Sequence, residues 1–484
     1  MKVLLINPPN FHQVRVPGSN QLANLLHDCA PPMGLMYLQS FLRSESDHEV
    51  KLWNAQTLAR PGLKALDQIL DRYRPDLVGI TVMMLNWYDA LDTARLVRNK
   101  LPSAHIVLGG PYISVYPEET LIQPEIDSVV IGEGEHSFLE LAKRVSRNEP
   151  LEGAQGVWYK ENGSIVRNPR RPIEINPDRF PFPDRSDFDP LQHRLATNRL
   201  APSAVIISSR GCPFACTFCA NHDRHYRERT PENIVAEVIS CKNQGYRSLD
   251  FYDDIFNITK QRVMEICDTL LKHKVNLPWS CRCRVGEVDE EMISRMAQSG
   301  CTRISFGIES ASPKILEQIR KHITPEQSVT AINLCRKYKI ATLGYYIVGF
   351  PGETMEQIND TIKLAFKLNC DFPIFYTLMP EPGSEIYGQA IKDPNFGGDY
   401  YRQYTRNPQK QFTLKLWETA VTEKQLLRLI GRAYLRYYFR FSYLFNSARK
   451  LNSFEDLKAK TVAALKMGRF LLSERGHSPI RNAW

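Results

Sequence analysis

The chain has 484 residues, of which 43% are hydrophobic and 24% are charged. This balance is typical of soluble globular proteins, and the length predicts two or three domains rather than one core. A net charge of +9 suits anionic ligands, but it is too diffuse over this length to indicate a nucleic-acid-binding protein.

The eleven cysteines do not indicate a disulfide framework. The chain begins directly with a predicted strand, without the apolar stretch of a secretory signal, and no apolar run is long enough to span a bilayer. We therefore expect a cytoplasmic protein whose thiols stay reduced.

Strands and helices are predicted to alternate through residues 1–150. Strands are predicted over 2–7, 49–53, 77–84, 105–108 and 128–131, and helices over 33–43, 63–73 and 88–100. This alternation indicates a doubly wound (Rossmann-like) parallel sheet, whose ligand lies beyond the carboxyl ends of the strands. No G-x-G-x-x-G follows the first strand, which argues against a dinucleotide site. A predicted β-hairpin over 157–166 and a linker over 170–190 lead out of this domain.

Three cysteines follow a buried, β-branched strand that begins at residue 203. Cys212, Cys216 and Cys219 have the spacing C-x3-C-x2-C and lie on the loop that leaves this strand. Three thiolates can ligate three irons of a 4Fe–4S cluster and leave the fourth iron open for a co-substrate. The alternative is a structural zinc site in a non-enzymatic binding protein, with His222 or His225 as the fourth ligand.

Five more predicted strand–helix units follow the cysteine loop. Their strands end near residues 252, 280, 306, 348 and 378, each before a polar or glycine-rich segment. Six units predict a partial (β/α)6 barrel of the TIM type, with its active site at the carboxyl ends of the strands. The predicted division is therefore a first domain (1–150), hairpin and linker (151–198), barrel (199–395) and a helical carboxyl-terminal region (396–484).

The order of these motifs resembles that of the cobalamin-dependent (class B) radical S-adenosylmethionine (SAM) enzymes. PPMGLMYL, PDLVGIT, LGGP and GEGE follow the order of their cobalamin-binding domain. The cysteine loop, the acidic pair, GIES and GFPGET follow the order of their radical SAM domain. The resemblance implies a 4Fe–4S cluster, SAM and cobalamin as cofactors, without a lower axial histidine because D-x-H-x-x-G is missing. It makes the zinc alternative remote.

The resemblance also implies which residues contact the cofactors. Cobalamin is expected at Asn7, Pro9, Asn54, Thr81, Met83, Gly109, Gly110, Pro111, Tyr112, Glu133, Gly134 and Glu135. Tyr112 and Asn54 depart from the family pattern, in which His and Asp are common. SAM is expected at Phe218, Asp253 or Asp254, Arg282 or Arg284, Ser305 and Glu309. An aspartate would receive the amino group of SAM, and an arginine would pair with its carboxylate.

Four further residues are candidates for proton or hydrogen transfer. Cys281 and Cys283 either face the barrel mouth or pack as small hydrophobic residues, and packing is favoured. Tyr345 and Tyr346 are consecutive on one predicted strand, so only one of them points into the barrel.

A capping box, Thr422-x-x-Gln425, opens a predicted helix over 422–445. Four arginines lie on one of its faces at i, i+4 spacing: Arg428, Arg432, Arg436 and Arg440. A helix packed on the barrel with a solvated basic face is favoured. The alternatives are peripheral contact with an anionic membrane and a lid over a hydrophobic substrate.

Most members of this family methylate unactivated carbon. The resemblance therefore implies a methyltransferase that acts through methylcobalamin and a 5′-deoxyadenosyl radical, supplied with electrons by a flavodoxin- or ferredoxin-type donor. A second expectation is a ring closure or rearrangement without net methyl transfer, as in the anaerobic porphyrin-ester cyclases. The substrate is expected to be a small or lipid-like molecule.

Overall fold

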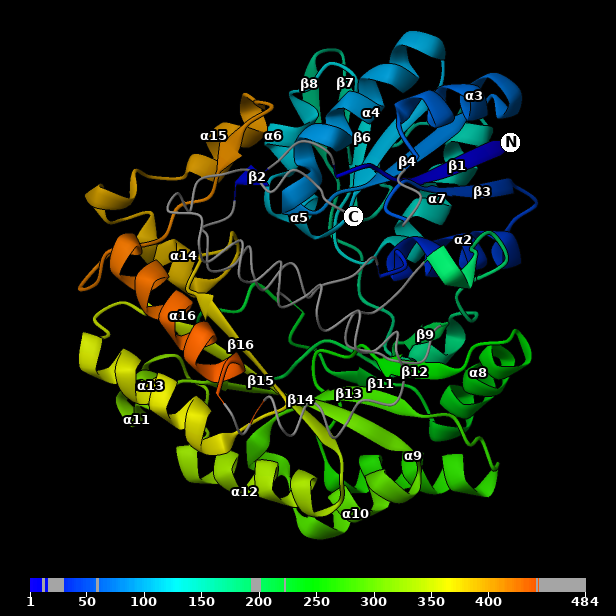
Figure 1. Cartoon of the computed structure of the whole chain (residues 1–484). Coiled ribbons are helices and arrows are strands. Elements are labelled where there is room, and N and C mark those ends of the chain that lie inside the picture. The colour runs from blue at the N-terminus through cyan, green and yellow to red at the C-terminus, as the bar shows by residue number, and fades with distance from the viewer. Residues whose placement is uncertain are drawn as a thin grey trace.

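Two sheets organise the molecule, one in each half of the chain (Figure 1). The structure is a computed structural model that describes residues 1–10, 14–15, 30–57, 61–192, 202–221, 223–440 and 443. In Figure 1 the amino-terminal sheet lies above the second sheet, and the carboxyl-terminal helices α14 (Glu385–Ala390), α15 (Tyr400–Arg406) and α16 (Glu423–Tyr438) lie along one side of both.

The amino-terminal sheet has seven strands in the order β3-β1-β4-β5-β6-β7-β8. They are β1 (Lys2–Asn7), β3 (Glu49–Asn54), β4 (Leu77–Thr81), β5 (His105–Gly109), β6 (Ser128–Val130), β7 (Val157–Glu161) and β8 (Ser164–Arg167). The first five in this order pair in parallel, and the hairpin β7–β8 adds two antiparallel strands. Strand order reverses between β1 and β4, which is where doubly wound folds bind their ligands. The predicted doubly wound sheet is confirmed, although β4 ends three residues earlier than expected.

Helices cover both faces of this sheet, so its central strands are apolar throughout. α2 (Met33–Glu45) and α7 (Gly134–Ser146) bury their apolar sides on one face, and α3 (Leu63–Tyr73) and α4 (Trp87–Lys100) on the other. Two short helices, α5 (Pro111–Val115) and α6 (Pro117–Leu121), follow β5. In β1 every residue from Val3 to Ile6 is at most 1% exposed, as a strand between two helical layers requires.

The second sheet has six parallel strands in the order β16-β15-β14-β13-β12-β9. They are β9 (Ser203–Ile206), β12 (Ser248–Phe251), β13 (Trp279–Cys283), β14 (Cys301–Glu309), β15 (Ala341–Val348) and β16 (Phe372–Thr377). The six predicted units are confirmed. Two strand ends were wrong. β13 continues to Cys283, because Cys281 and Cys283 pair with Ile304 and Phe306 of β14, and β14 continues to Glu309, which pairs with Tyr346 of β15.

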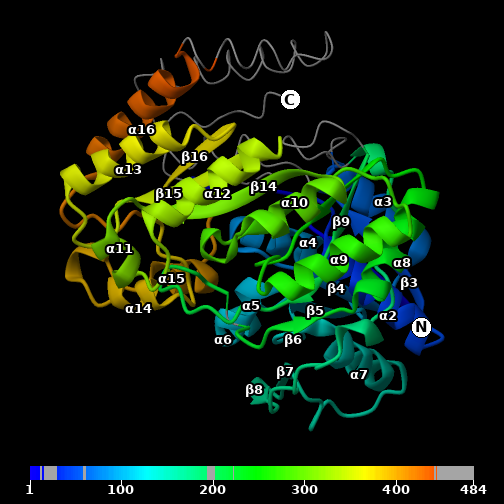
Figure 2. The same ribbon diagram turned by 90° about the horizontal axis from the view of Figure 1, so that it is seen from below.

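Six of the described helices cover one face of the second sheet, the face turned to the viewer in Figure 2. They are α8 (Pro231–Asn243), α9 (Lys260–Lys272), α10 (Glu290–Gln298), α11 (Pro313–Gln318), α12 (Pro325–Lys337) and α13 (Met355–Leu368). A Ser, Thr or Asp side chain accepts a backbone N–H at the start of each of them, which fixes where each helix begins. The other face, called the inner face below, is turned toward the amino-terminal domain (Figure 1).

After the barrel, the chain returns to the amino-terminal domain, which the sequence analysis did not foresee. Tyr387 of α14 and Tyr401 of α15 belong to the same buried cluster as α4 and α5. The Tyr116 hydroxyl donates to Asp399 at 2.9 Å, and β17 (Phe412–Thr413) pairs with β2 (Val14–Arg15). Residues 385–414 thus complete the core of the first domain.

α16 begins at the predicted capping box and packs on the barrel. The Tyr434 hydroxyl contacts the backbone of Phe375 at 2.8 Å, and the Tyr437 hydroxyl donates to the carbonyl of Cys370 at 2.6 Å. These contacts agree with the favoured packed helix, and the basic face stays largely exposed at Arg428, Arg432 and Arg436. Of the residues predicted to extend this helix, 441, 442, 444 and 445 lie outside the described part, and membrane contact stays a prediction. None of the described helices is long and apolar enough to cross a bilayer.

Candidate active site

The cysteine loop is tied down at both ends. β10 (Ser209–Arg210) and β11 (Arg227–Glu228) pair across its base. Gly211 has φ +78°, and a Cβ at this position would lie 2.5 Å from the carbonyl oxygen of His225, so only glycine fits. Inside the loop, the Thr217 N–H donates to the carbonyl of Ile319 at 3.1 Å. The backbone therefore holds the cysteines in place without help from a disulfide.

The three predicted cluster ligands fit an iron–sulfur cluster. Cys212, Cys216 and Cys219 are all free thiols, two of them half-buried and Cys219 exposed. Burial raises the pKa of Cys212 and Cys219, so binding a cluster must displace their protons. Among the described residues, no three His, Cys, Asp or Glu side chains form a group for a single metal ion. A 4Fe–4S cluster does not need such a group, because each thiolate ligates its own iron.

Ion pairs join the cysteine loop to the GEGE segment of the amino-terminal domain. Arg210 contacts Glu135 at 2.7 Å and Glu133 at 3.3 Å, and Arg227 contacts Glu133 at 2.9 Å. Arg227 also pairs with Asp223 inside the loop. Although burial favours the neutral acid, Arg227 and Arg210 lower the pKa of Glu133. The strand ends of the first sheet are thereby fixed against the cysteine loop of the second.

Three of the predicted cobalamin residues already have protein partners for their side chains. The carboxylates of Glu133 and Glu135 are engaged by arginines, so they serve to dock the domains. Tyr112 is 4% exposed, and its hydroxyl lies 2.7 Å from Thr405 Oγ1 in α15. Any contact of Tyr112 with a ligand at the strand ends therefore falls to its backbone. The partners of Tyr112, Glu133 and Glu135 are 75 to 293 positions away in the sequence, so no local sequence pattern reveals these contacts.

The remaining predicted cobalamin residues lie at or just beyond the carboxyl ends of β1, β3, β4, β5 and β6. Met83 is 52% exposed just beyond β4, an apolar side chain suited to a large flat ligand. A Cβ at Gly134 would meet no atom within 4 Å, which leaves open space above the backbone. Gly110 has φ +108°, and a Cβ there would lie 2.7 Å from the Val82 carbonyl oxygen. Pro9, Thr81, Gly109 and Pro111 border the same edge. These features fit cobalamin.

Asn7 and Asn54 hydrogen-bond to each other across the first sheet. Asn7 Nδ2 donates to Asn54 Oδ1 at 2.7 Å, at the paired ends of β1 and β3. The Asn54 oxygen also accepts the backbone N–H of Gln56 at 3.1 Å. Asn54 therefore shapes the loop after β3, and its amide oxygen already has two donors.

Of the acidic pair, only one carboxylate is available to a ligand. Asp253 is 2% exposed and accepts the Ser208 N–H at 2.6 Å, together with the Ser208 hydroxyl. It therefore fixes the strand that precedes the cysteines. Asp254 is exposed and accepts Asn221 Nδ2 at 2.8 Å, directly after the cysteine loop. The prediction of Asp253 or Asp254 for the SAM amino group thus narrows to Asp254.

Glu309 has an unusual backbone conformation at the end of β14. Its φ is +62°, which a non-glycine residue seldom adopts, and its buried carboxylate pairs with Lys321 at 2.8 Å. Lys321 was not foreseen from the sequence. Its Nζ lies 5.8 Å from the Phe218 ring, so it links the end of β14 to the cysteine loop. Ser305 is buried on the inner face of β14, four residues earlier.

The inner face of the sheet carries the two predicted arginines. The Arg284 guanidinium lies 3.9 Å over the ring of Phe214 in the cysteine loop. Arg282 is two residues deeper and lies 3.6 Å over the ring of Tyr252. The structure thus separates the two arginines, and Arg284 is the one beside the cysteines.

The candidates for hydrogen transfer fall on opposite faces. Cys281 and Cys283 belong to the core between sheet and helices, as does Tyr346, which is fully buried. The favoured packing of the two cysteines agrees with this placement. Tyr345 joins a separate small cluster on the inner face, so it is the only one of the four with access to the barrel interior.

The GFPGE loop after β15 also reaches the cysteine loop, because the rings of Phe350 and Phe218 lie 6.0 Å apart. Glu353 is 1% exposed and accepts the backbone N–H groups of Gly349 at 2.7 Å and Phe350 at 3.1 Å. Its Oε1 has no hydrogen-bond partner within the described residues.

We expect the Glu353→Gln variant to gain stability over the wild type as pH rises. Burial raises the pKa of Glu353 to about 7. The folded protein thus prefers the neutral acid. The stability that Glu353 contributes is therefore complete below the unfolded pKa of about 4.3 and is lost as pH rises through the folded pKa of about 7. Urea unfolding of both proteins between about pH 4 and pH 8 measures the change. A stability difference that is constant with pH would contradict the prediction.

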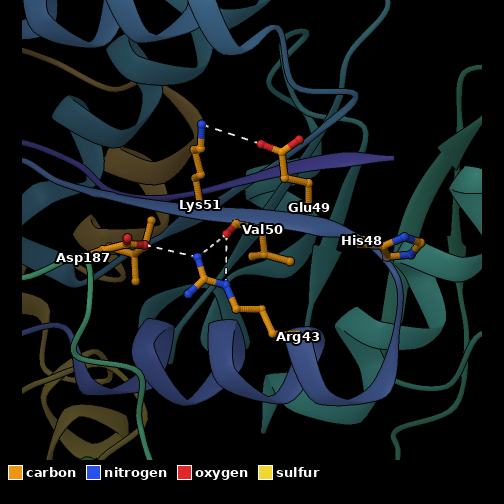
Figure 3. A pocket seen from close by; sticks show the side chains of 7 residues that line it. Arg43, His48, Glu49, Val50, Lys51 and Asp187 are labelled. Carbon is orange, nitrogen blue, oxygen red and sulfur yellow. Dashed lines mark hydrogen bonds and ion pairs between the residues drawn. The ribbon is translucent and has the colours of Figure 1, made fainter.

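A pocket on the amino-terminal domain lies away from this site (Figure 3). Arg43 donates to the Val50 carbonyl at 2.5 Å and faces Asp187 of the linker at 3.4 Å, and Lys51 pairs with Glu49 at 3.6 Å. The pocket is at the amino end of β3, whereas ligands of doubly wound folds lie at the carboxyl ends. Its contacts fasten the linker to the domain.

Comparison with known proteins identifies the same two domains that the fold shows. The model of the radical SAM superfamily matches residues 206–365, and that of the B12 binding domain matches residues 22–142. An uncharacterized methyltransferase of Pyrococcus horikoshii is 35% identical over 447 residues, which are 91% of this chain and 93% of that protein. The chain belongs to the cobalamin-dependent radical SAM enzymes.

Two further proteins place this radical SAM enzyme among its relatives. The anaerobic magnesium-protoporphyrin IX monomethyl ester cyclase of Rubrivivax gelatinosus is 28% identical, over 80% of this chain and 69% of that protein. The fold is similar to the radical SAM methyltransferase TsrM of Kitasatospora setae, with a TM-score of 0.65 and 21% identity over 81% of this chain and 74% of that one.

The family assignment confirms the predicted cofactors: a 4Fe–4S cluster and SAM for the radical SAM domain, and cobalamin for the B12 binding domain. It does not support the zinc alternative. His225 is exposed and pairs with Asp223 at 3.5 Å, and His222 lies outside the described residues.

Proposed function

We propose that this enzyme is a methyltransferase that acts on an unactivated carbon of a small molecule. The observation that carries the proposal is the docking of the two domains. Arg210 and Arg227 hold the end of β6 against the cysteine loop, so the cobalamin edge and the cluster edge share one space. The similarity to the Pyrococcus methyltransferase, which spans nearly the whole of both chains, supports the same function.

In this proposal the residues of the chain bind and orient the cofactors. Cys212, Cys216 and Cys219 hold the cluster, and Asp254, Arg284 and Glu309 hold SAM with the help of Ser305 and the Phe218 backbone. The strand ends around Met83, Gly110 and Gly134 hold cobalamin. When bound, these cofactors supply hydrogen-atom abstraction and methyl transfer. The chain contributes the alignment of the reacting centres in a space between two docked domains.

The proposal is tested by the mass of the product. The protein is purified without oxygen, loaded with iron, sulfide and cobalamin, and incubated with SAM, a low-potential flavodoxin or ferredoxin, and extracts of cells that lack its gene. We expect a metabolite that gains one methyl group, with conversion of SAM to S-adenosylhomocysteine. Labelled methyl-SAM identifies that metabolite, and heat-denatured enzyme is the control. Consumption of SAM with no labelled product would count against methyl transfer.

A radical ring closure or rearrangement is the second candidate. It is favoured by the 28% identity to the Rubrivivax cyclase, which also extends across both domains. The same incubation separates the two functions. A cyclase changes its substrate without incorporating the methyl label, whereas a methyltransferase incorporates one methyl per product molecule.

A further inference from the structure

Three neighbouring charged side chains on the inner face carry a net positive charge. Asp250 of β12 is 3.5 Å from Arg282 of β13 and 3.8 Å from Arg303 of β14. The Asp250 and Arg303 side chains are 3% and 9% exposed, and that of Arg282 is 28% exposed. Asp250 therefore faces both guanidinium groups within 4 Å in a largely buried place, and Asp254 acts on Arg282 from further away.

The pairing of Asp250 with these arginines is also loose. Charge-assisted hydrogen bonds between guanidinium and carboxylate are normally about 2.7–2.9 Å long. Asp250 instead accepts its short bond from the Ser280 hydroxyl, at 2.7 Å. Arg303 Nε has no hydrogen-bond partner within the described part of the chain, and burial lowers the pKa of Arg303. A buried cation that is incompletely paired is costly, and an anion would offset that cost.

Arg282 and Arg303 are distinct from Arg284, the arginine that we assign to the SAM carboxylate. Arg284 lies beside the cysteine loop, over the ring of Phe214. Arg282 is two residues deeper in β13, and successive residues on the same face of a strand are about 6–7 Å apart. Arg303 is deeper again, because it pairs in register with Ser280. An anion bound by Arg282 and Arg303 therefore lies below the SAM carboxylate.

Apolar and aromatic side chains surround the two arginines on the inner face. Tyr252, on which Arg282 stacks, is 41% exposed. Leu343 and Ile374 form a small cluster with Tyr345, separate from the main core. A molecule whose anionic group reaches Arg282 would therefore place its remaining part against an apolar surface.

We propose that the inner face is the substrate subsite, in which Arg282 and Arg303 bind an oxyanion of the substrate, a carboxylate or a phosphate. Its apolar or aromatic part lies against Tyr252, which is 41% exposed, and against the half-buried Tyr345. The inference rests on the proposed function and narrows its substrate to a molecule with an anionic group. The planar forks of two guanidinium groups suit either oxyanion.

Small probes test this inference on the full-length protein loaded with its cluster and SAM. Benzoate and phenyl phosphate carry an oxyanion on an aromatic ring, and benzamide is a neutral control of similar shape. Thermal unfolding and equilibrium dialysis are measured at constant ionic strength. We expect both anions to bind and to raise the unfolding temperature, and benzamide to do neither. The probe that binds more tightly identifies the kind of oxyanion.

Two variants and a control locate the subsite. Arg282→Gln is expected to weaken anion binding by about ten- to a hundredfold, the value of one or two charge-assisted hydrogen bonds. Arg303→Lys keeps the charge but loses the fork, and should also weaken binding. The control is Arg295→Gln on the exposed side of α10, which should leave binding unchanged. If Arg303→Lys does not fold, Arg282→Gln decides the result.

Each outcome bears on one proposal. Equal binding of benzamide, or full anion binding by Arg282→Gln, would overturn the subsite. Displacement of benzoate by saturating SAM would also overturn it, since the anion would then occupy the SAM carboxylate position. Iron content and SAM binding are measured on the same samples. Bound iron and SAM without anion binding would refute only the subsite, whereas anion binding without iron or SAM would refute only the proposed function.

Discussion

Replacing Cys216 with alanine is expected to lower the iron content from about four atoms per chain to near zero and to reduce activity to background. Cys216 lies on a loop whose backbone is fixed by the Thr217–Ile319 hydrogen bond, and the seven described cysteines outside this loop are all buried, so none of them can take its place. Two remaining thiolates do not hold the cluster, and without the cluster SAM has no iron to bind. Iron and sulfide analysis and the visible absorbance of the anaerobic protein measure the loss.

Cys335→Ala is the matched control for this experiment. Cys335 is a free thiol that is fully buried in α12, within the core between sheet and helices. Its removal should cost about 1 kcal/mol of stability and leave the iron content unchanged. Full iron content in Cys216→Ala, or loss of iron in Cys335→Ala, would show that the cluster is held elsewhere.

Replacing Arg210 with methionine is expected to loosen the docking of the two domains. The substitution leaves Glu133 and Glu135 with one arginine instead of two, and it removes the guanidinium that lies 4.4 Å over the Phe180 ring. Removing one partner of a fully buried ion pair costs about 3–5 kcal/mol, and partial exposure of Glu133 reduces this to about 2–3 kcal/mol. Hydrogen exchange of backbone amides in residues 132–136 and 209–213 measures the free energy of opening.

Arg224→Met provides the control, because Arg224 is an exposed arginine on the same loop. It should leave exchange in both segments unchanged. Iron content should stay near that of the wild type in both variants, while activity falls only in Arg210→Met, since the cluster and cobalamin edges are no longer held together. Unchanged exchange in Arg210→Met would mean that other contacts dock the domains.

The fold could be predicted from the sequence because its signals are local. The alternation of apolar strands and capped helices identifies both parallel sheets, and the carboxyl ends of strands indicate where ligands bind. The same rule located the cysteine loop and Glu309. It could not separate Asp253 from Asp254, because the difference arises from Ser208, which lies 45 residues earlier in the chain.

Long-range packing explains the other differences. Tyr112 and Glu133 were expected to face cobalamin, yet their partners come from α15 and from the strand before the cysteines. Strand alternation showed that only one of Tyr345 and Tyr346 enters the barrel. Which one does so depends on the side that α13 and α16 cover, and this is a property of the folded chain.

The return of residues 385–414 to the amino-terminal domain has a consequence for synthesis on the ribosome. The side chains of Tyr112 and Tyr116 are covered by Tyr401 and Asp399, which emerge almost 290 residues later. At about 5–20 residues per second, the nascent first domain waits roughly 15–60 s with this aromatic surface uncovered. The first domain therefore reaches its final stability only after residues 385–414 have been synthesised.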